Sequence, residues 1–463
     1  MVSFFFPAYN LKAMPVSPAR AAAFDILLRV ECESSYASDL LHSSAHQHLS
    51  ASDHALATEL VMGVLRWQSL LDADIATASS QPLSKLDTEI LIALRLALYQ
   101  FVYLDRVPQR AALHESVELV KRARKRSAAS FVNAVLRKLS STPRYVEISA
   151  TDEIASFETL ARALAHPPWL VERWACAYGL DTAYQICKHD QSVPTTAIRL
   201  RTPTAEDELK QEGITLSSGG LLTSARRVTT GDITKTPVFR SGQIAIQDEA
   251  SQLIAALVGH GTHILDCCAA PGGKTLAIAD HNPESTITAV ELHAHRARLL
   301  QSRLHQNLSD SSPRIEIVTA DVQHLSVIRL FDRVLADVPC SGTGTIGRNP
   351  EIKWRLTPED LVQLPQRQSA ILRSALAQVA PGGRLIYSTC SLEKEENEDV
   401  VEKAISENSS FRVIDCRSEL ARLQTNKELT WSDPESLTRG PYLRTIQGVH
   451  PCDGFFAAIL ERS

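Results

Sequence analysis

Short apolar segments alternate with helix-like stretches over the C-terminal half of the chain, and this alternation limits the possible folds more than any other feature. The apolar segments are HILDCC, TITAVEL, RIEIVTAD, FDRVLADV, GRLIYSTC, FRVID and FFAAIL. Strands that are separated by helices favour a mainly parallel sheet with crossover helices on its faces. We therefore predict a doubly wound, Rossmann-like α/β domain over residues 241–463.

The rest of the chain has a different periodicity. Between residues 18 and 144, apolar side chains recur every three or four positions in five stretches, which predicts an all-helical domain. Residues 145–240 combine the helical piece HPPWLVERWACAYG with the extended runs TTAIRLRT, ITLSSGGLL and DITKTPVFR, so we interpret them as a small α+β connector. Residues 1–17 are expected to be a disordered or wrongly assigned extension, because Met14 opens a more natural start. A multidomain chain agrees with the length of 463 residues, which exceeds the usual size of one core.

Composition excludes several classes of protein. Hydrophobic residues make up 44% and charged residues 22%, as in ordinary soluble domains, and no apolar run reaches the length of a membrane span. The N-terminus has no basic region or cleavage site of a secretory signal, so a cytoplasmic protein is expected. The nine cysteines are scattered and form no CxxC pair, which favours neither a disulfide framework nor a metal site.

Basic residues are concentrated toward the N-terminus. The formal net charge is -5, yet residues 1–145 hold sixteen Lys or Arg against thirteen Asp or Glu. The densest basic patch is the predicted phosphate-contacting surface, with a solvated helix face as the alternative. It consists of Lys121, Arg122, Arg124, Lys125 and Arg126, followed by Arg137 and Lys138.

Carboxylates close four successive predicted strands. They are Asp266, Glu291, Asp321 and Asp337. In a doubly wound sheet, ligands bind beyond the carboxyl ends of the strands, so four acids in register predict a binding edge. A single one of them would be interpreted as a helix cap or a solvated turn.

A glycine-containing turn follows the first of these strands. In AAPGGKT, Gly272 and Gly273 permit close approach of a ligand to the backbone and to the amides of the next helix. A phosphate-binding P-loop is disfavoured because position 268, where its first glycine would stand, is Cys. The GxGxxG that starts at Gly342 is followed by Arg-Asn-Pro and not by a helix, so we treat it as chance. Glu291 suits a ribose diol and Asp321 an adenine amino group, so S-adenosylmethionine fits better than NAD.

Two cysteines stand at predicted strand ends, in the contexts DVPCSG and STCS. Carbon 5 of cytosine is too weak a nucleophile to accept a methyl group unaided, but a thiolate that adds to carbon 6 activates it. Cys340 and Cys390 are the candidates for that thiolate. Asp337 is placed to hold a proton on cytosine nitrogen 3.

With these residues in hand, the chain resembles the RNA 5-methylcytosine methyltransferases, and most closely their bacterial 16S ribosomal RNA group (Sun or RsmB). The resemblance is carried by DCCAAPGGKT, DVPCSGTGTIGRNPEIKW and YSTCSLEKEENE, and the helical N-terminal part also resembles the RNA-binding NusB domain of this group. It implies that Cys390 is the nucleophile, that Cys340 assists release of the adduct, and that the target is the position-967 type of cytosine. It also implies a set of residues lining the S-adenosylmethionine pocket: Cys268, Ala269, Ala270, Pro271, Gly272, Gly273, Lys274, Glu291, Asp321 and Asp337.

Two positions depart from the family pattern. Glu291 stands where the family often has Asp, which keeps the hydroxyl-binding chemistry. Thr202 in RLRT stands where Asn is common, which puts an RNA contact of the connector in doubt.

We expect an RNA partner and a monomer, without metal or membrane. The target cytosine must leave its stack to reach the site. Arg348 and Lys353 are candidate phosphate contacts near the active edge, and surface ion pairing is their alternative. Two other functions stay open: the same chemistry on transfer RNA or another ribosomal site, and a non-catalytic NusB-like RNA-binding or antitermination factor.

Overall fold

The computed structural model divides the chain into two compact units. The first comprises residues 1–173 and the short segment 349–355, and the second comprises residues 174–348 and 356–463. The described residues are 16–33, 35–141, 156–308, 312–325 and 329–463. The predicted extension at residues 1–17 therefore lies outside the described residues, apart from its last two positions.

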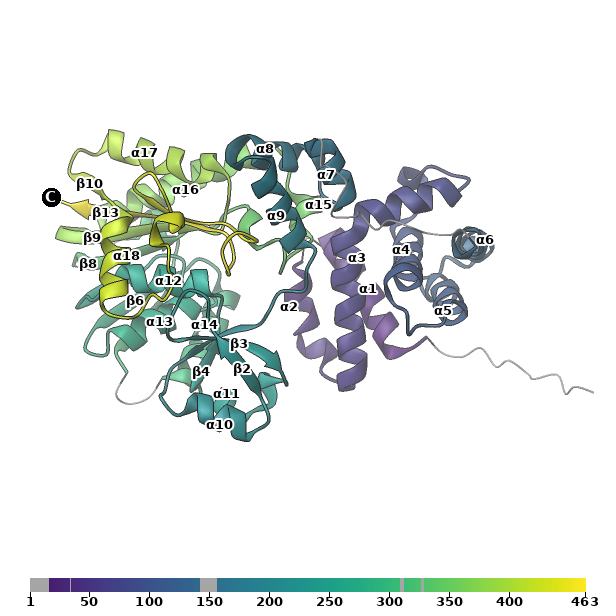
Figure 1. Ribbon diagram of the computed structural model, residues 1–463, viewed down its shortest axis with the longest axis horizontal. Helices are drawn as coiled ribbons and strands as arrows, with labels where there is room; N and C mark the ends of the chain where they lie inside the picture. The colour runs from purple at the N-terminus through teal and green to yellow at the C-terminus, as the bar shows by residue number, and fades with distance from the viewer. Residues whose placement is uncertain (1–15, 34, 142–155, 309–311, 326–328) are drawn as a thin grey trace, which may run out of the picture. The chain divides into compact units, whose positions relative to one another are not determined.

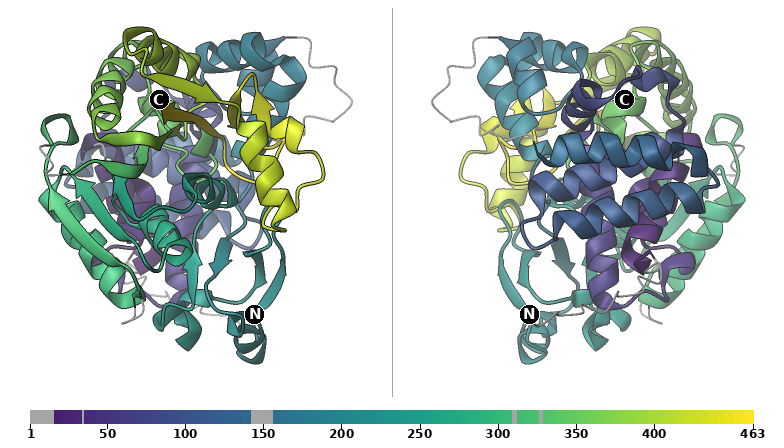
Figure 2. Two further views of the ribbon diagram at one scale, coloured as in Figure 1. Left: turned by 90° about the vertical axis from the view of Figure 1, so that its left-hand side faces the viewer. Right: turned by 90° about the vertical axis from the view of Figure 1, so that its right-hand side faces the viewer.

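Helices build the first unit, as predicted. The five predicted stretches correspond to α1, α3, α4, α5 and α6, and the short α2 is an addition (Figure 2, right). Apolar side chains from all six pack into one core, while Ser50 caps α3 by accepting a hydrogen bond from the amide of Asp53. The bounds are α1 Pro18–Glu33, α2 Ala37–Leu41, α3 Ala51–Ala78, α4 Thr88–Tyr103, α5 Gln109–Arg122, α6 Ala129–Ser140 and α7 Phe157–Ala163.

The connector is a four-stranded antiparallel sheet with short helices. Its strand order is β2-β3-β1-β4, and two of the predicted extended runs contain β1 and β2. The prediction for DITKTPVFR was wrong: Asp232 and Thr236 cap backbone amides there, which starts helical turns and not a strand. The sheet also continues past the predicted boundary at residue 240. The bounds are α8 Pro168–Tyr178, α9 Leu180–Asp190, β1 Ala197–Leu200, α10 Ala205–Gln211, β2 Thr215–Ser218, β3 Ala225–Thr230, α11 Pro237–Arg240 and β4 Ile244–Ile246.

A nine-stranded mixed sheet forms the rest of the second unit (Figure 1). Its order is β11-β12-β13-β9-β8-β5-β6-β7, with β10 also paired to β13. Strands β5 to β9 run parallel, and β13 joins β9 antiparallel, so all seven predicted strands are present. The bounds are β5 His263–Asp266, β6 Thr286–Glu291, β7 Arg314–Thr319, β8 Phe331–Asp337, β9 Val379–Thr389, β10 Phe411–Ile414, β11 Thr438–Arg439, β12 Tyr442–Thr445 and β13 Phe455–Arg462.

Helices cover both faces of this sheet. Ile264 of β5 packs in the core that holds α12, α13 and α18, whereas the next residue, Leu265, packs in the core that holds α16 and α17. The bounds are α12 Glu249–Val258, α13 Gly273–His281, α14 Ala294–Asn307, α16 Asp360–Ala377, α17 Glu398–Glu407 and α18 Cys416–Thr425, while α15 Ile352–Arg355 belongs to the first unit. Over the described ranges, every helix is too short or too polar to span a bilayer.

The strand order creates a switch point between β5 and β8. From β5 the chain moves outward to β6 and β7, and it then returns to β8 on the other side of β5. Loops that leave such a switch point diverge and open a crevice at the carboxyl ends of the strands. The sheet therefore locates a candidate site at the ends of β5, β8 and the neighbouring β9.

Candidate functional site

The four predicted carboxylates lie along the carboxyl edge of the parallel strands. Asp266, Glu291 and Asp337 are the last residues of β5, β6 and β8, and Asp321 follows the end of β7 by two residues. Asp337 is also in register with Ser388 near the end of β9. The sheet thus brings together residues that are far apart in the sequence.

The glycine turn bends the chain from β5 into α13. Gly272 has a φ of 102°, and a Cβ there would approach Leu300 Cδ1 to 2.7 Å, so the turn requires glycine. Arg296 steadies the turn by donating to the carbonyl of Ala270 at 3.0 Å. The amides at the start of α13 therefore face the edge that carries the carboxylates.

Asp266 is buried beneath this turn. Its Oδ2 accepts a hydrogen bond from Thr275 Oγ1 at 2.7 Å, while its Oδ1 has no hydrogen-bond partner among the described residues. Burial raises the pKa of Asp266 to about 6, against the opposing hydrogen bond from Thr275. Glu291 is also buried, and one of its oxygens accepts from the amide of His293 at 2.9 Å. Acceptor oxygens at this edge are thus available to a ligand.

The two candidate cysteines meet at the neighbouring strand ends. Cys340 Sγ lies 3.3 Å from Cys390 Sγ, and both residues are partly buried. The contact with Cys390, followed by burial, raises the pKa of the Cys340 thiol. Burial strongly raises the pKa of the Cys267 and Cys268 thiols, which leaves them poor nucleophiles.

A lysine from the glycine turn pairs with the carboxylate of Asp337, near the two cysteines. Lys274 Nζ donates to Asp337 Oδ2 at 2.8 Å and lies 4.9 Å from the centre of the Phe455 ring. Burial alone would lower the pKa of Lys274, but the carboxylate of Asp337, and in smaller part Cys390, raise it. Ser388 Oγ donates to the other oxygen of Asp337 at 2.8 Å. Asp337 is therefore fixed from two sides, and Cys390 lies within electrostatic range of the Lys274 ammonium.

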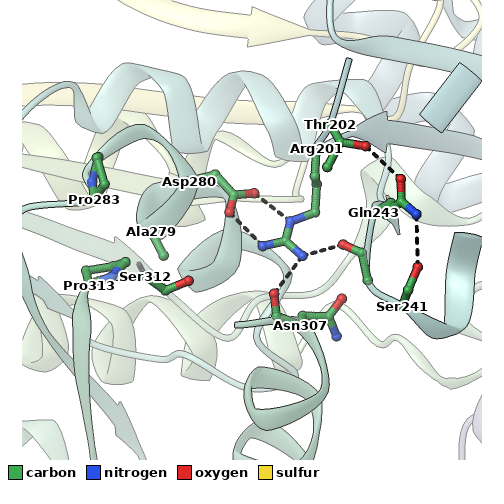
Figure 3. A pocket seen from close by; sticks show the side chains of 11 residues that line it. Arg201, Thr202, Ser241, Gln243, Ala279, Asp280, Pro283, Asn307, Ser312 and Pro313 are labelled. Atoms are coloured by element: carbon green, nitrogen blue, oxygen red, sulfur yellow. Dashed lines mark hydrogen bonds and ion pairs between the residues drawn. The ribbon is translucent and has the colours of Figure 1, made fainter. Parts of the chain in front are cut away.

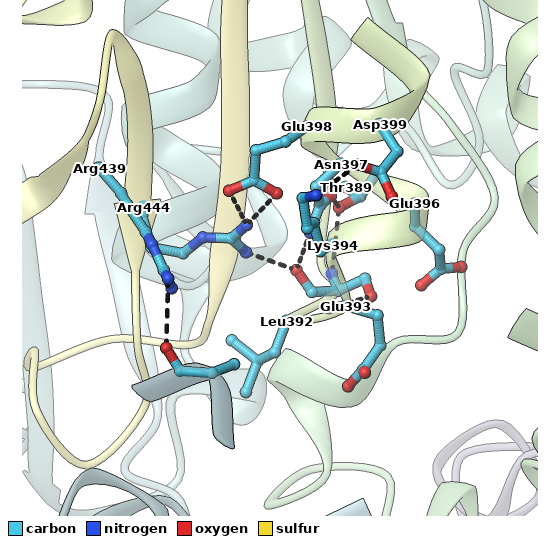
Figure 4. A network of polar contacts seen from close by, with 12 residues as sticks. Thr389, Leu392, Glu393, Lys394, Glu396, Asn397, Glu398, Asp399, Arg439 and Arg444 are labelled. Carbon is cyan, nitrogen blue, oxygen red and sulfur yellow. Dashed lines mark hydrogen bonds and ion pairs between the residues drawn. The ribbon is translucent and has the colours of Figure 1, made fainter. Parts of the chain in front are cut away.

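Buried polar side chains hydrogen-bond the loop after β8, which carries Cys340, to the loop after β9, which carries Cys390. Glu396 is fully buried and accepts from both the amide and the hydroxyl of Ser341, at 2.8 and 2.5 Å. Asn397 accepts from Thr389 Oγ1 at 2.5 Å and donates to the carbonyl of Ser391 at 2.9 Å (Figure 4). The motif YSTCSLEKEENE marks this segment by resemblance, but no pattern in it predicts that Glu396 and Asn397 are buried.

Arg444 supports the same loop from β12. Its Nη1 donates to the carbonyl of Ser391 at 2.9 Å, and its Nη2 pairs with Glu398 at the start of α17 (Figure 4). A guanidinium bonded in this way joins the loop after β9 to a strand and a helix. The position of Cys390 therefore depends on several elements of the second unit.

The residues predicted to contact RNA have varied surroundings. In the basic patch, Lys121, Arg122 and Lys125 form ion pairs with Glu118, Asp25 and Asp87. Lys138 donates to the carbonyl of Thr77. Arg124, Arg126 and Arg137 are exposed.

The two candidates near the active edge, Arg348 and Lys353, both have partners within the protein. Arg348 is clamped by Asp453 at 2.8 Å and by Asp248 at 3.0 Å, which agrees with the ion-pair alternative. Lys353 is only 1% exposed and lies in the first unit, where its ammonium donates to the carbonyls of Arg66 and Ala165. The prediction that Lys353 contacts phosphate is wrong for this structure, because the ammonium is buried.

A cavity of about 390 Å³ separates the connector sheet from the ends of α13 and α14 (Figure 3). Arg201 crosses it and pairs with Asp280 at 2.7 Å, while Thr202 Oγ1 donates to Gln243 at 2.9 Å. The Thr202 hydroxyl is therefore hydrogen-bonded within the connector. The cavity is remote from the carboxyl edge, because Asp280 lies at the far end of α13. Within the described ranges, no cluster of His, Cys, Asp or Glu is suited to hold a metal ion.

Comparisons with known proteins give a consistent result. The sequence model described as 16S rRNA methyltransferase RsmB/F matches residues 255–461, and that of the NusB family matches residues 17–141. The chain is 33% identical over 417 residues to a probable ribosomal RNA small subunit methyltransferase B of Bacillus subtilis, which covers 86% of this chain and 90% of the relative. A protein of the same description from Synechocystis is 32% identical and covers 96% and 99%. The crystal structure of PH0851 shares the fold, with a TM-score of 0.79, 23% identity and coverage of 97% and 100%.

Proposed function

Because the chain belongs to the ribosomal RNA small subunit methyltransferase B family, we propose that it methylates carbon 5 of a cytosine in 16S ribosomal RNA, with S-adenosylmethionine as donor and Cys390 as nucleophile. The observation that carries the proposal is the meeting of Cys390, Cys340 and the Lys274–Asp337 pair beside the glycine turn. No other described part of the chain combines thiols with an ammonium group at a strand switch point.

The residues at the edge fit the donor. The free Oδ1 of Asp266 and the start of α13 are suited to its amino-acid part, and Glu291 is suited to the ribose diol. Asp321 follows β7 and is suited to the adenine amino group, although its Oδ1 already accepts from the amide of Gln323. When bound, S-adenosylmethionine supplies an electrophilic methyl group.

The side chains of the protein activate and orient the cytosine. The thiolate of Cys390 adds to carbon 6, forming a carbon–sulfur bond and moving the ring electron pair toward carbon 5 and nitrogen 3. Asp337 holds a proton at nitrogen 3 and so neutralises the charge of the adduct. After carbon 5 is methylated, it loses its proton to a base and the carbon–sulfur bond breaks, which restores the aromatic ring and the thiolate. We assign Cys340 to assist this release.

Electrostatics favours Cys390 over Cys340 as the nucleophile. The raised pKa of Cys340 keeps that thiol protonated, as a group that assists release should be.

Two variants test the roles of the cysteines. Cys390→Ala should abolish methyl transfer to a 16S ribosomal RNA transcript, because no thiolate remains to activate carbon 5. Cys340→Ala should accumulate a protein–RNA adduct that survives a denaturing gel. Full activity of Cys390→Ala would reverse the assignment.

Bisulfite sequencing of total RNA, with and without the gene, tests the substrate. We expect one cytosine of 16S ribosomal RNA to lose its protection from conversion. Loss of a transfer RNA signal instead would move the same chemistry to another substrate. An unchanged methylation map would favour a non-catalytic RNA-binding factor.

A further inference from the structure

Helix α14 carries a basic surface that the proposed mechanism does not use. Its 14 residues, AHRARLLQSRLHQN, include three arginines and two histidines but no Asp or Glu. The chain as a whole has a net charge of -5, so this concentration of positive charge is local. The inner side of the helix packs through Leu300 and Leu304. The outer side is left to solvent.

The outer side of α14 presents unneutralised arginines. Arg298 and Arg303 are exposed, and neither guanidinium has an ion-pair or hydrogen-bond partner in the described part of the chain. His295, Arg298 and His305 share one face, because residues three, seven and ten positions apart lie on the same side of a helix. Arg303 lies about 140° around the helix from Arg298, on the flank nearer the glycine turn. In the basic patch at residues 121–126, by contrast, three of the side chains are ion-paired with carboxylates.

The basic face adjoins the candidate site. Helix α14 begins three residues after Glu291, the last residue of β6, so its first turn lies at the carboxyl edge. The stem of Arg303 is near the glycine turn, since a Cβ on Gly272 would lie 3.9 Å from Arg303 Cδ. A helix of this length extends about 21 Å from the edge.

We propose that the exposed side of α14 binds the phosphate backbone of the RNA strand next to the target cytosine, through Arg298 on the outer face and Arg303 on the flank nearer the glycine turn. The inference rests on the proposed function, which brings an RNA base to the same edge. A polyanion fits the face by charge, and the exposed side chains of Gln301, Ser302 and Gln306 add partners for ribose hydroxyls and phosphates. His295 and His305 add charge when they are protonated.

Filter binding of the full-length protein to a labelled 16S ribosomal RNA transcript, over a range of KCl concentrations, tests this proposal. The double variant Arg298→Ala/Arg303→Ala removes the unpaired guanidiniums. We expect the slope of log K against log[KCl] to fall in magnitude by about 1.4 to 1.8, and the affinity to fall roughly tenfold. The matched control is Arg412→Ala, because Arg412 is exposed but paired with Glu461 at the far side of the sheet. This control should bind RNA like the wild type.

Four further outcomes are decisive. An unchanged salt slope in the double variant, or an equal loss in the Arg412→Ala control, would overturn the proposal. Loss of binding to anionic phosphatidylserine vesicles with intact RNA binding would overturn it in favour of a lipid surface. If the wild type binds RNA through α14 but methylates no cytosine, the proposed function fails while this inference stands. Calorimetric binding of S-adenosylmethionine checks that the double variant is folded.

Discussion

Glu396 offers the sharpest test of how the cysteine loops are held. Its carboxylate accepts from Ser341 N, Ser341 Oγ and Gln368 Nε2, at 2.8, 2.5 and 3.1 Å. In Glu396→Ala, the Ser341 hydroxyl can turn to Ser391 Oγ, 3.0 Å away, and Gln368 keeps its bond to the carbonyl of Pro339. The amide of Ser341 and the second Nε2 hydrogen of Gln368 are left without an acceptor.

The expected cost follows from this count. Each buried N–H without a partner costs about 1–3 kcal/mol, and the cavity left by the carboxyl group adds about 1 kcal/mol, so Glu396→Ala should destabilise the second unit by about 3–7 kcal/mol. The cysteines should also lose their fixed separation, and a displacement of about 1 Å can cost 10²-fold in rate. Single-turnover methyl transfer should therefore fall by about 10- to 100-fold.

Glu396→Gln is the matched control. Its amide oxygen can still accept from Ser341 N and Gln368, and its NH₂ can donate to the Ser341 hydroxyl, so stability should change by about 1 kcal/mol or less. Urea unfolding measures both variants, and hydrogen exchange of the loops at residues 339–344 and 390–397 localises the effect. Equal losses in the two variants, or none in Glu396→Ala, would refute the reasoning.

Three more predictions concern single side chains. Burial raises the pKa of Asp266 to about 6, above its value in the unfolded chain. The free energy of unfolding therefore keeps its full contribution from protonated Asp266 below about pH 4 and loses it as the pH rises through 6. Asp266→Asn should abolish this loss, which is worth up to about 3 kcal/mol, in urea titrations at pH 4 to 8 without ligand. Lys353→Met should destabilise the first unit by about 1–3 kcal/mol, because two buried carbonyls lose their donor, whereas exposed Lys403→Met should change it by less than about 0.5 kcal/mol. Arg348→Ala should leave the salt slope of RNA binding unchanged, since its guanidinium holds Asp453 and Asp248; a smaller slope would show a phosphate contact.

Much of the fold could be predicted from periodicity. The five helices of the first unit and the seven strands of the large sheet follow from apolar spacings of three to four and from short apolar runs. The error at DITKTPVFR arose because Asp232 and Thr236 act as local caps, an effect that alternation of side chains does not reveal. Strand β11, with two residues, is too short to give a pattern.

Only part of the candidate site could be predicted from the sequence. The residues at the strand ends could be placed, because parallel strands bring their carboxyl ends to one edge. The locking role of Glu396 and Asn397 could not, since burial of an acidic run depends on tertiary partners such as Ser341. The pairing of Arg201 with Asp280 likewise joins elements that only the folded connector brings together.

The segment GRNPEIKW shows why neighbouring residues need not share a role. Arg348 closes an ion-pair cluster of the second unit, but one residue later the chain enters the first unit, where Lys353 is buried. A basic pair in one motif was therefore interpreted as one phosphate-contacting patch, whereas each charge satisfies acceptors in a different core. Arg298 and Arg303 of α14 lack such acceptors among the described residues, although no motif marks them. For nucleic-acid binding, the presence or absence of an intramolecular partner decides more than the density of basic residues, because a guanidinium that is already paired must give up that pair before it binds a phosphate.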